Sequence, residues 1–219
     1  MTNGVSQWRI CARKPGHRLA LALLTLGMAV SCGSIPKTKY YALRLPAPAP
    51  ANDSKTNFVV GVEHFRALDV LRDDRIVYYE SPTQLNFYEY HRWSSDPPTL
   101  LSELTARALH EMHLFADVRM LPSREPVDYI LKGRLFHFEE VVEGSGGKAR
   151  VGLGLTLVRS RDHKVVWSAE RQVERPLQTP GVAGVVEALN ASTEGLLSEV
   201  LPGLAAQVER DLTQPGPSQ

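Results

Sequence analysis

Two stretches of alternating apolar residues near the middle of the chain constrain its fold most strongly. Residues 129–142 and 150–159 both favour extended structure, and the residues between them, 143–148 (EGSGGK), are typical of a flexible loop. In the second stretch, large apolar side chains fall on one face and small side chains on the other: Val151, Leu153, Leu155 and Leu157 against Gly152, Gly154 and Thr156. The pattern predicts an antiparallel pair of strands with one heavy core face and one nearly bare face.

Other segments rich in aromatic and β-branched residues are bounded by turn-forming residues and predict further strands. These segments are 39–45, 58–65, 75–80, 84–93, 117–120 and 164–174. Residues 46–50 (PAPAP) lack amide hydrogens at every second position, so we expect a spacer loop there.

Two segments have the periodicity of helices. The first is expected from about Pro98 to Met112, after the capping residues 94–96, and it has an apolar stripe at spacings of three and four: Leu101, Leu104, Ala108, Met112 and Phe115. The second begins near Gly181, and Pro202 predicts a kink or break before residues 204–212 continue. We expect residues 213–219, which contain two prolines, to form a disordered tail.

Together these elements predict an α+β fold, a single domain over residues 39–212 with a mostly antiparallel sheet packed by two main helices. Without residues 1–31, 188 of the 219 residues remain, enough for one core. They carry 21 basic and 24 acidic residues, since four of the 25 basic residues precede position 32. No nucleic-acid partner is expected, because such binding normally needs a clustered basic face.

The N-terminus has the three parts of a secretory signal in order. Four basic residues and no acidic residue precede position 19: Arg9, Arg13, Lys14 and Arg18. The apolar run 19–30 (LALALLTLGMAV) follows, and its 12 residues are fewer than the about 20 that a membrane-spanning helix needs. We therefore expect residues 1–31 to be a signal peptide.

The signal ends in Ala29-Val30-Ser31-Cys32-Gly33, which resembles the bacterial lipobox. The other cysteine, Cys11, lies inside the expected signal, so an internal disulfide is excluded after cleavage. The resemblance implies that Cys32 carries a diacylglyceryl group and an N-acyl chain, such as palmitate. Residues 32–38 would then form a lipidated tether. No other cofactor is expected. Three acyl chains would hold the protein to a membrane durably. Because Gly33 and not Asp follows, it also implies the periplasmic face of the outer membrane.

Several motifs in order resemble the ABC-type transport auxiliary lipoproteins, which include the lipoprotein of the paraquat-inducible lipid-transport system. The matching segments are 40–43 (YYAL), 73–79 (DDRIVYY), 88–93 (YEYHRW), 97–98 (PP), 128–133 (DYILKG), 136–139 (FHFE) and 187–190 (EALN). Many relatives carry Pro-x-Tyr-Leu where this chain has residues 65–68 (FRAL).

This resemblance implies a non-catalytic periplasmic component of an ABC system whose bridging subunit carries mammalian-cell-entry (MCE) domains. Such systems move phospholipid or other hydrophobic molecules between the inner and outer membranes. The partners would be the membrane, through the lipid anchor, and the MCE-domain subunit, with a homo-oligomer also open. Alternatives are an outer-membrane lipoprotein that regulates a cell-wall synthase or joins an export assembly, and a lipid-anchored enzyme with a convergent polar cleft.

Residues of catalytic or metal-binding type do not form a recognisable motif. Residues 110–113 (HEMH) resemble the zinc-protease signature, but that signature places its two histidines four residues apart, and His110 and His113 are three apart. A Gly-x-Ser-x-Gly nucleophile motif does not occur. We therefore expect neither a catalytic nor a metal site.

Aromatic residues are dense between positions 78 and 93 and could form either a partner-binding patch or part of the core. Strand alternation favours burial of Phe87 and Trp93. Tyr78, Tyr88 and Tyr90 stay as candidates for partner binding.

Overall fold

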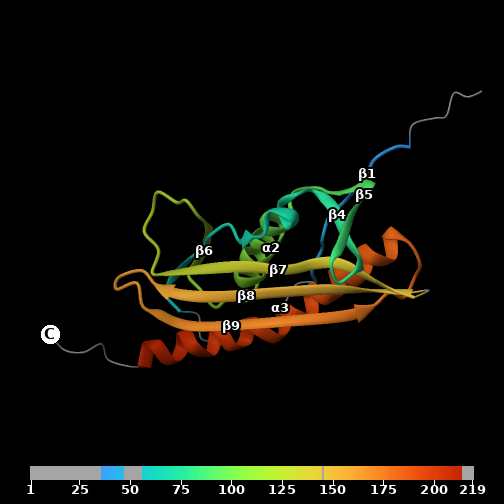
Figure 1. Cartoon of the computed structure of the whole chain (residues 1–219). Helices are drawn as coiled ribbons and strands as arrows, with labels where there is room; N and C mark the ends of the chain where they lie inside the picture. The colour runs from blue at the N-terminus through green and yellow to red at the C-terminus, as the bar shows by residue number, and fades with distance from the viewer. Residues whose placement is uncertain (1–35, 47–55, 145, 214–219) are drawn as a thin grey trace, which may run out of the picture. The chain divides into compact units, whose positions relative to one another are not determined.

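Strand β7 (Tyr129–Glu143) is the element around which the sheet is built (Figure 1). The computed structural model describes residues 36–46, 56–144 and 146–213. One edge of β7 pairs antiparallel with β8 (Gly146–Arg159) along its whole length. The other edge pairs in parallel with three short strands in turn, β2 (Val59–Val62), β3 (Arg66–Ala67) and β4 (Arg75–Ser81).

Four further strands extend the sheet from this centre. β5 (Gln84–Trp93) pairs antiparallel with β4, and β1 (Lys39–Tyr41) joins β5 in parallel. β6 (Asp117–Met120) pairs in parallel with β2, and β9 (Val165–Pro176) lies antiparallel beside β8. The sheet is mixed: its antiparallel pairings are extended, whereas each parallel pairing joins two to four residue pairs. The predicted α+β single domain with two main helices is confirmed.

Helix α2 (Pro97–Glu111) begins where the capping residues predict. The Asp96 side chain accepts a hydrogen bond from the Thr99 amide at 3.1 Å, and prolines occupy the first two helical positions, where no amide hydrogen is needed. The predicted apolar stripe is buried, from Leu101 to Phe115. A short 3-10 helix, η2 (Asp69–Arg72), precedes β4.

Helix α3 (Val182–Thr213) runs through Pro202 without ending. Of the predicted kink or break, the break is therefore wrong. A proline inside a helix removes one hydrogen bond and costs about 3 kcal/mol. The helix is buried on both sides of Pro202, where three side chains are at most 2% exposed: Leu201, Leu204 and Val208. Their packing outweighs the lost hydrogen bond.

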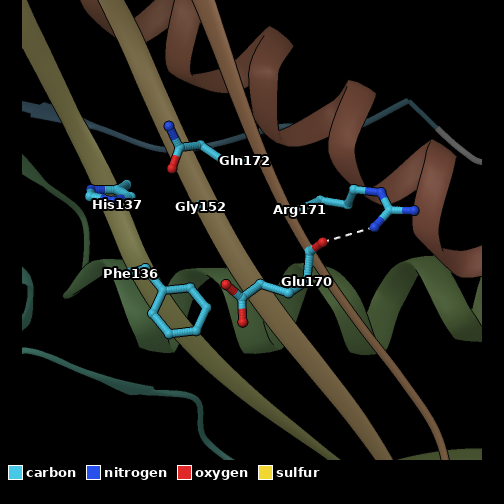
Figure 2. Close-up of a pocket in the computed structure, with 6 residues that line it drawn as sticks. All are labelled: Phe136, His137, Gly152, Glu170, Arg171 and Gln172. Carbon is cyan, nitrogen blue, oxygen red and sulfur yellow. Dashed lines mark hydrogen bonds between the residues drawn. The ribbon is translucent and has the colours of Figure 1, made fainter.

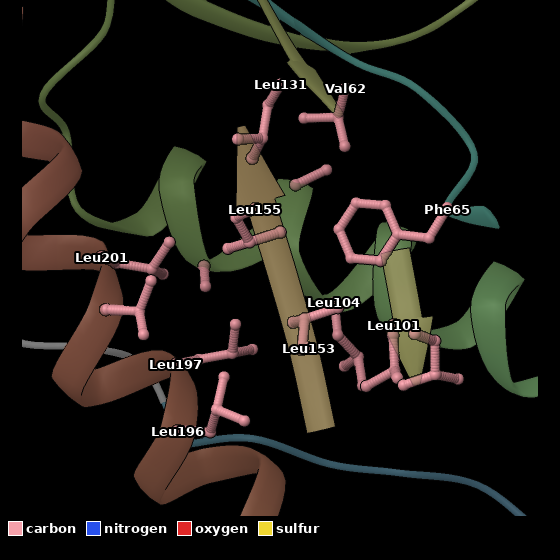
Figure 3. Packing of buried hydrophobic residues seen from close by; sticks show 14 of the residues in the cluster. Val62, Phe65, Leu101, Leu104, Leu131, Leu153, Leu155, Leu196, Leu197 and Leu201 are labelled. Carbon is pink, nitrogen blue, oxygen red and sulfur yellow. The ribbon is translucent and has the colours of Figure 1, made fainter. Parts of the chain in front are cut away.

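The core lies between one face of the sheet and the two helices (Figure 3). Leu153 and Leu155 of β8 point toward Leu196, Leu197 and Leu201 of α3, as the alternation predicts, and all five side chains are buried. No helix in the described ranges combines the length and apolarity that a membrane crossing requires.

The connection between β7 and β8 is shorter than predicted. The sequence predicted a flexible loop over residues 143–148, and this prediction is wrong. Gly146 pairs with Glu143 and Gly147 with Val142, so residues 143 and 146–148 belong to the paired strands. Gly144, directly after β7, has φ of +59°, a left-handed conformation that glycine adopts without steric cost.

Several sequence expectations fall outside the described residues. These are the signal peptide 1–31, the lipidation of Cys32, the tether up to residue 35, the spacer loop beyond Pro46 and the tail from residue 214.

Candidate interaction surface

The bare face predicted for β8 is the face of the β7–β8–β9 sheet that the helices leave open. Figure 2 looks onto this face, with the three strands in front of α2 and α3. Gly152 and Gly154 form its floor, because the intervening side chain of Leu153 enters the core on the opposite side. We call this surface the outer face.

A β-bulge in β7 places two consecutive rings on the outer face. The register shifts between Leu135 and His137, so Phe136 and His137 both lie over β8. A Cβ at Gly154 would lie 3.0 Å from the Phe136 ring, and one at Gly152 would lie 3.0 Å from the His137 ring. The two glycines therefore allow both rings to rest close to the strand.

Three hollows adjoin along this face. The central hollow, of about 330 Å³, is the one drawn in Figure 2 and is lined by Phe136, His137, Gly152, Glu170, Arg171 and Gln172. The arginine hollow, of about 390 Å³, shares Phe136 and Glu170 with it and includes Arg66 and Arg134. The tyrosine hollow, of about 520 Å³, shares His137 with the central hollow and includes Tyr79 and Arg150. The outer face is thus hollowed along much of its length.

Glu139 is a buried carboxylate beside the central hollow, with 1% of its surface exposed. Its Oε1 accepts a hydrogen bond from Nε of Arg150 at 2.7 Å and lies 2.8 Å from Nδ1 of His137. Its Oε2 accepts from the Phe138 amide at 2.6 Å. A buried carboxylate is tolerated when it is paired and hydrogen-bonded in this way. The network fixes the orientation of the His137 ring.

The central hollow offers binding groups rather than a nucleophile. Its six lining residues include no Ser, Thr, Cys or Lys side chain next to His137. Arg171 uses Nη1 to donate to the Glu170 carbonyl at 2.9 Å, and its Nε donates to Glu199 of α3. The geometry suits recognition of a ligand or a protein segment.

The structure brings together two of the three tyrosines predicted as partner-binding candidates. The Tyr78 and Tyr88 rings are 4.6 Å apart, and the Tyr88 hydroxyl donates to Oε2 of the buried Glu140 at 2.6 Å. Burial and the Glu140 carboxylate raise the pKa of Tyr88 above its usual range. The Tyr88 hydroxyl is thus engaged inside the domain, whereas Tyr90 lies apart with 40% of its surface exposed.

The other two aromatic predictions concern the core. Trp93 is 1% exposed, as expected, and its ring centroid lies 5.2 Å from that of Phe138, with the two rings tilted by 51°. Phe87 is half-buried and packs against the core. His110 and His113, the zinc-signature histidines, have ring centroids 6.4 Å apart, and the described residues hold no group of three metal-ligand side chains.

Sequence reasoning did not identify the residues of the outer face as a site. The sequence does carry a signal for the bulge, because the large apolar residues change phase: Leu131 and Leu135 occupy odd positions, whereas Phe136 and Phe138 occupy even ones. For Arg66 of β3, no local sequence pattern indicates a place on this surface, because its position beside β7 depends on strand register.

The family of the chain follows from comparison with known proteins. Residues 41–200 match the family described as ABC-type transport auxiliary lipoprotein component. The chain belongs to this family. The resemblance seen in the sequence motifs is therefore confirmed, and the protein is an auxiliary lipoprotein component of transport.

One of the solved structures that this auxiliary lipoprotein resembles, the first of the three given below, is similar enough to show a shared fold. A crystal structure of a protein from Xanthomonas campestris has a TM-score of 0.72 at 22% identity, over 80% of this chain and 100% of that one. The PelC dodecamer from Paraburkholderia phytofirmans has a TM-score of 0.44 and 18% sequence identity, and the match covers 72% of this chain and 94% of that one. Lipoprotein GNA1162 from Neisseria meningitidis has a TM-score of 0.37 and 14% sequence identity, and the match covers 70% of this chain and 99% of that one. The search of curated proteins gave no match.

Proposed function

We propose that this auxiliary lipoprotein is anchored by acylated Cys32 at the periplasmic face of the outer membrane and docks the MCE-domain subunit of an ABC transport system. That system would move phospholipid or other hydrophobic molecules between the two membranes. The observation that carries the proposal is the family match over residues 41–200, which describes a lipoprotein component of ABC-type transport. The role is mechanical, and no reaction is assigned.

The position of Cys32 supports the anchoring part of the proposal. Residues 32–38 separate the cysteine from β1, and seven residues span at most about 25 Å when extended. An anchor at Cys32 would therefore keep the domain close to the membrane surface while leaving most of its surface accessible.

The shape of the outer face supports docking rather than catalysis. Its hollows are lined by charged side chains and single aromatic rings, and the most deeply placed acid, Glu139, is already satisfied by three neighbours. Such a surface can recognise a protein segment through polar contacts around a small aromatic centre.

Crosslinking in intact membranes tests the proposed partner. The protein would be produced together with an MCE-domain subunit from its own organism, and crosslinked products would be identified by mass spectrometry. We expect a specific adduct between the two. Failure to form any adduct in cells that make both proteins would refute the transport role, as would neighbouring genes that encode no permease, ATPase or MCE-domain protein.

The anchor has a separate test in Cys32→Ala. We expect this variant to incorporate no labelled fatty acid, because its acylated thiol is gone, while Cys11→Ala serves as the control and is labelled like wild type. Labelling of Cys32→Ala would show that the anchor has been assigned to the wrong residue.

A further inference from the structure

Two arginines lie directly opposite each other at the edge of the arginine hollow. In the parallel pairing of β3 with β7, Arg66 is in register with Arg134, so both side chains project on the same face, and both residues are exposed. Neighbouring strands are about 4.8 Å apart, and like charges at such positions are destabilising. This pair therefore needs an explanation outside the fold itself.

Neither arginine is neutralised within the described part of the chain. Arg66 forms no ion pair there, and the Arg134 guanidinium lies 5.2 Å from the Phe136 ring centroid, with no carboxylate partner. Lys132, the third cation of the hollow, has its own partner, because its Nζ is 3.8 Å from Glu63. Two guanidinium groups are thus left facing an open hollow.

The rest of the hollow limits what can occupy it. Its floor is Gly154 with the hydroxyl-bearing side chains of Thr156 and Ser168, and Glu170 closes the β9 side. The Glu170 carboxylate lies over Gly154, 3.8 Å from where a Cβ would be. A broad anionic surface would meet both Glu63 and Glu170. A single carboxylate between Arg66 and Arg134 would meet both guanidinium groups, while Glu63 on the same side already faces Lys132.

We propose that the arginine hollow binds an aspartate or glutamate carboxylate from an acidic segment of a partner protein. Guanidinium groups form bidentate, charge-assisted hydrogen bonds with carboxylates, and a single carboxylate can bridge two arginines on adjacent strands. The segment would cross the outer face with an apolar side chain on Phe136. A membrane surface is disfavoured, because recognition of anionic lipid normally uses four to eight clustered cations. The inference rests on the proposed function, with the MCE-domain subunit as the partner.

The variant Arg66→Glu separates a binding role from a structural one. It places a carboxylate opposite Arg134 and so replaces a repulsive cross-strand pair with an attractive one. The fold is expected to be at least as stable as wild type by urea unfolding, whereas binding of an acidic segment is lost. Arg66→Lys retains the charge without the bidentate geometry and is expected to bind at an intermediate level.

The test uses the full lipidated chain, produced with the MCE-domain subunit and carrying a photocrosslinking amino acid in place of Phe136. Adduct yield is expected to fall about tenfold with Arg66→Glu and with Arg134→Glu. The control Arg124→Glu, an equal charge change at an exposed arginine outside the three hollows, is expected to leave the yield unchanged. An equal adduct yield in wild type and Arg66→Glu would overturn the proposal.

A second crosslinker position, in place of Tyr90, separates this inference from the proposed function. Adducts from position 90 but not from position 136 would refute carboxylate binding in the arginine hollow and leave the proposed transport role unaffected. Adducts from neither position overturn both.

A vesicle assay addresses the membrane alternative. The full chain with Cys32→Ala is mixed with phosphatidylglycerol or phosphatidylcholine vesicles and floated on a density gradient. We expect no flotation that depends on Arg66. Flotation with phosphatidylglycerol alone, abolished by Arg66→Glu, would identify lipid headgroups as the ligand and overturn the proposal.

Discussion

Replacing Gly133 with alanine is expected to lower the free energy of unfolding by about 2–3 kcal/mol. Gly133 is buried in the middle of β7, opposite Leu155 of β8. A Cβ built on Gly133 would overlap the ring of Phe65, which is 5% exposed and belongs to the same buried cluster as Val62 and Leu101. The ring has little room to move, so the added methyl group must displace either Phe65 or the strand.

A double-mutant cycle tests this reasoning. Phe65→Ala alone is expected to cost about 3–5 kcal/mol through the cavity that it leaves. The double variant should cost about 1–3 kcal/mol less than the sum, because the methyl group then enters space that the ring has vacated. Urea unfolding of the purified protein, followed by circular dichroism, measures each free energy.

The control is Gly203→Ala, at an exposed position of α3 where a Cβ would meet the Trp167 ring at an ordinary 3.7 Å. It is expected to be neutral or to stabilise by up to about 1 kcal/mol through helix propensity. If Gly133→Ala unfolds within about 0.5 kcal/mol of wild type, or if the two single changes simply add, then the ring does not pack on the glycine as described.

Three further changes test other parts of the fold. Leu204→Ala, beyond Pro202, should cost about 2–5 kcal/mol in urea unfolding because Leu204 is fully buried; a cost under about 1 kcal/mol would mean that α3 does not pack there. Tyr88→Phe should cost about 1–3 kcal/mol by removing the donor to Glu140, and an unchanged midpoint would contradict that role. Asp73→Asn should cost about 1 kcal/mol at pH 7, since Arg75 lowers the pKa of Asp73 from 3.8 to about 2 at a partly exposed site. A depressed pKa contributes stability above the unfolded value, so that difference should shrink steadily as the pH falls from 4 through 2; a constant difference would refute the pairing.

Local periodicity was sufficient to predict much of the fold. The alternation in β8 predicted its buried face, and the spacing of Leu101, Leu104 and Ala108 predicted the buried side of α2. The start of α2 followed from Asp96, because the interactions of a capping residue lie within a few positions of it. These features depend on neighbours in the sequence.

Features that depend on distant neighbours were missed. Pro202 alone suggested a break in the last helix, but packing from distant strands sustains it. Tyr88 was a candidate for partner binding in the sequence, and its contact with Glu140 of β7 could not be predicted because it joins distant strands. The pairing of Arg66 with Arg134 depends on the register of strands 68 residues apart, and no local pattern encodes that register.

The central place of β7 also governs the order in which the chain can fold. β2, β3 and β4 precede β7 in sequence, so none of them can pair with β7 until it has been made. Val60 of β2 pairs with Tyr129, and Val77 of β4 pairs with Glu139. A chain that emerges N-terminus first during synthesis therefore exposes the apolar faces of these strands until residue 143 has emerged. Pairings of such long sequence separation form slowly. Protection from aggregation is then needed before β7 is available for pairing, and much less afterwards.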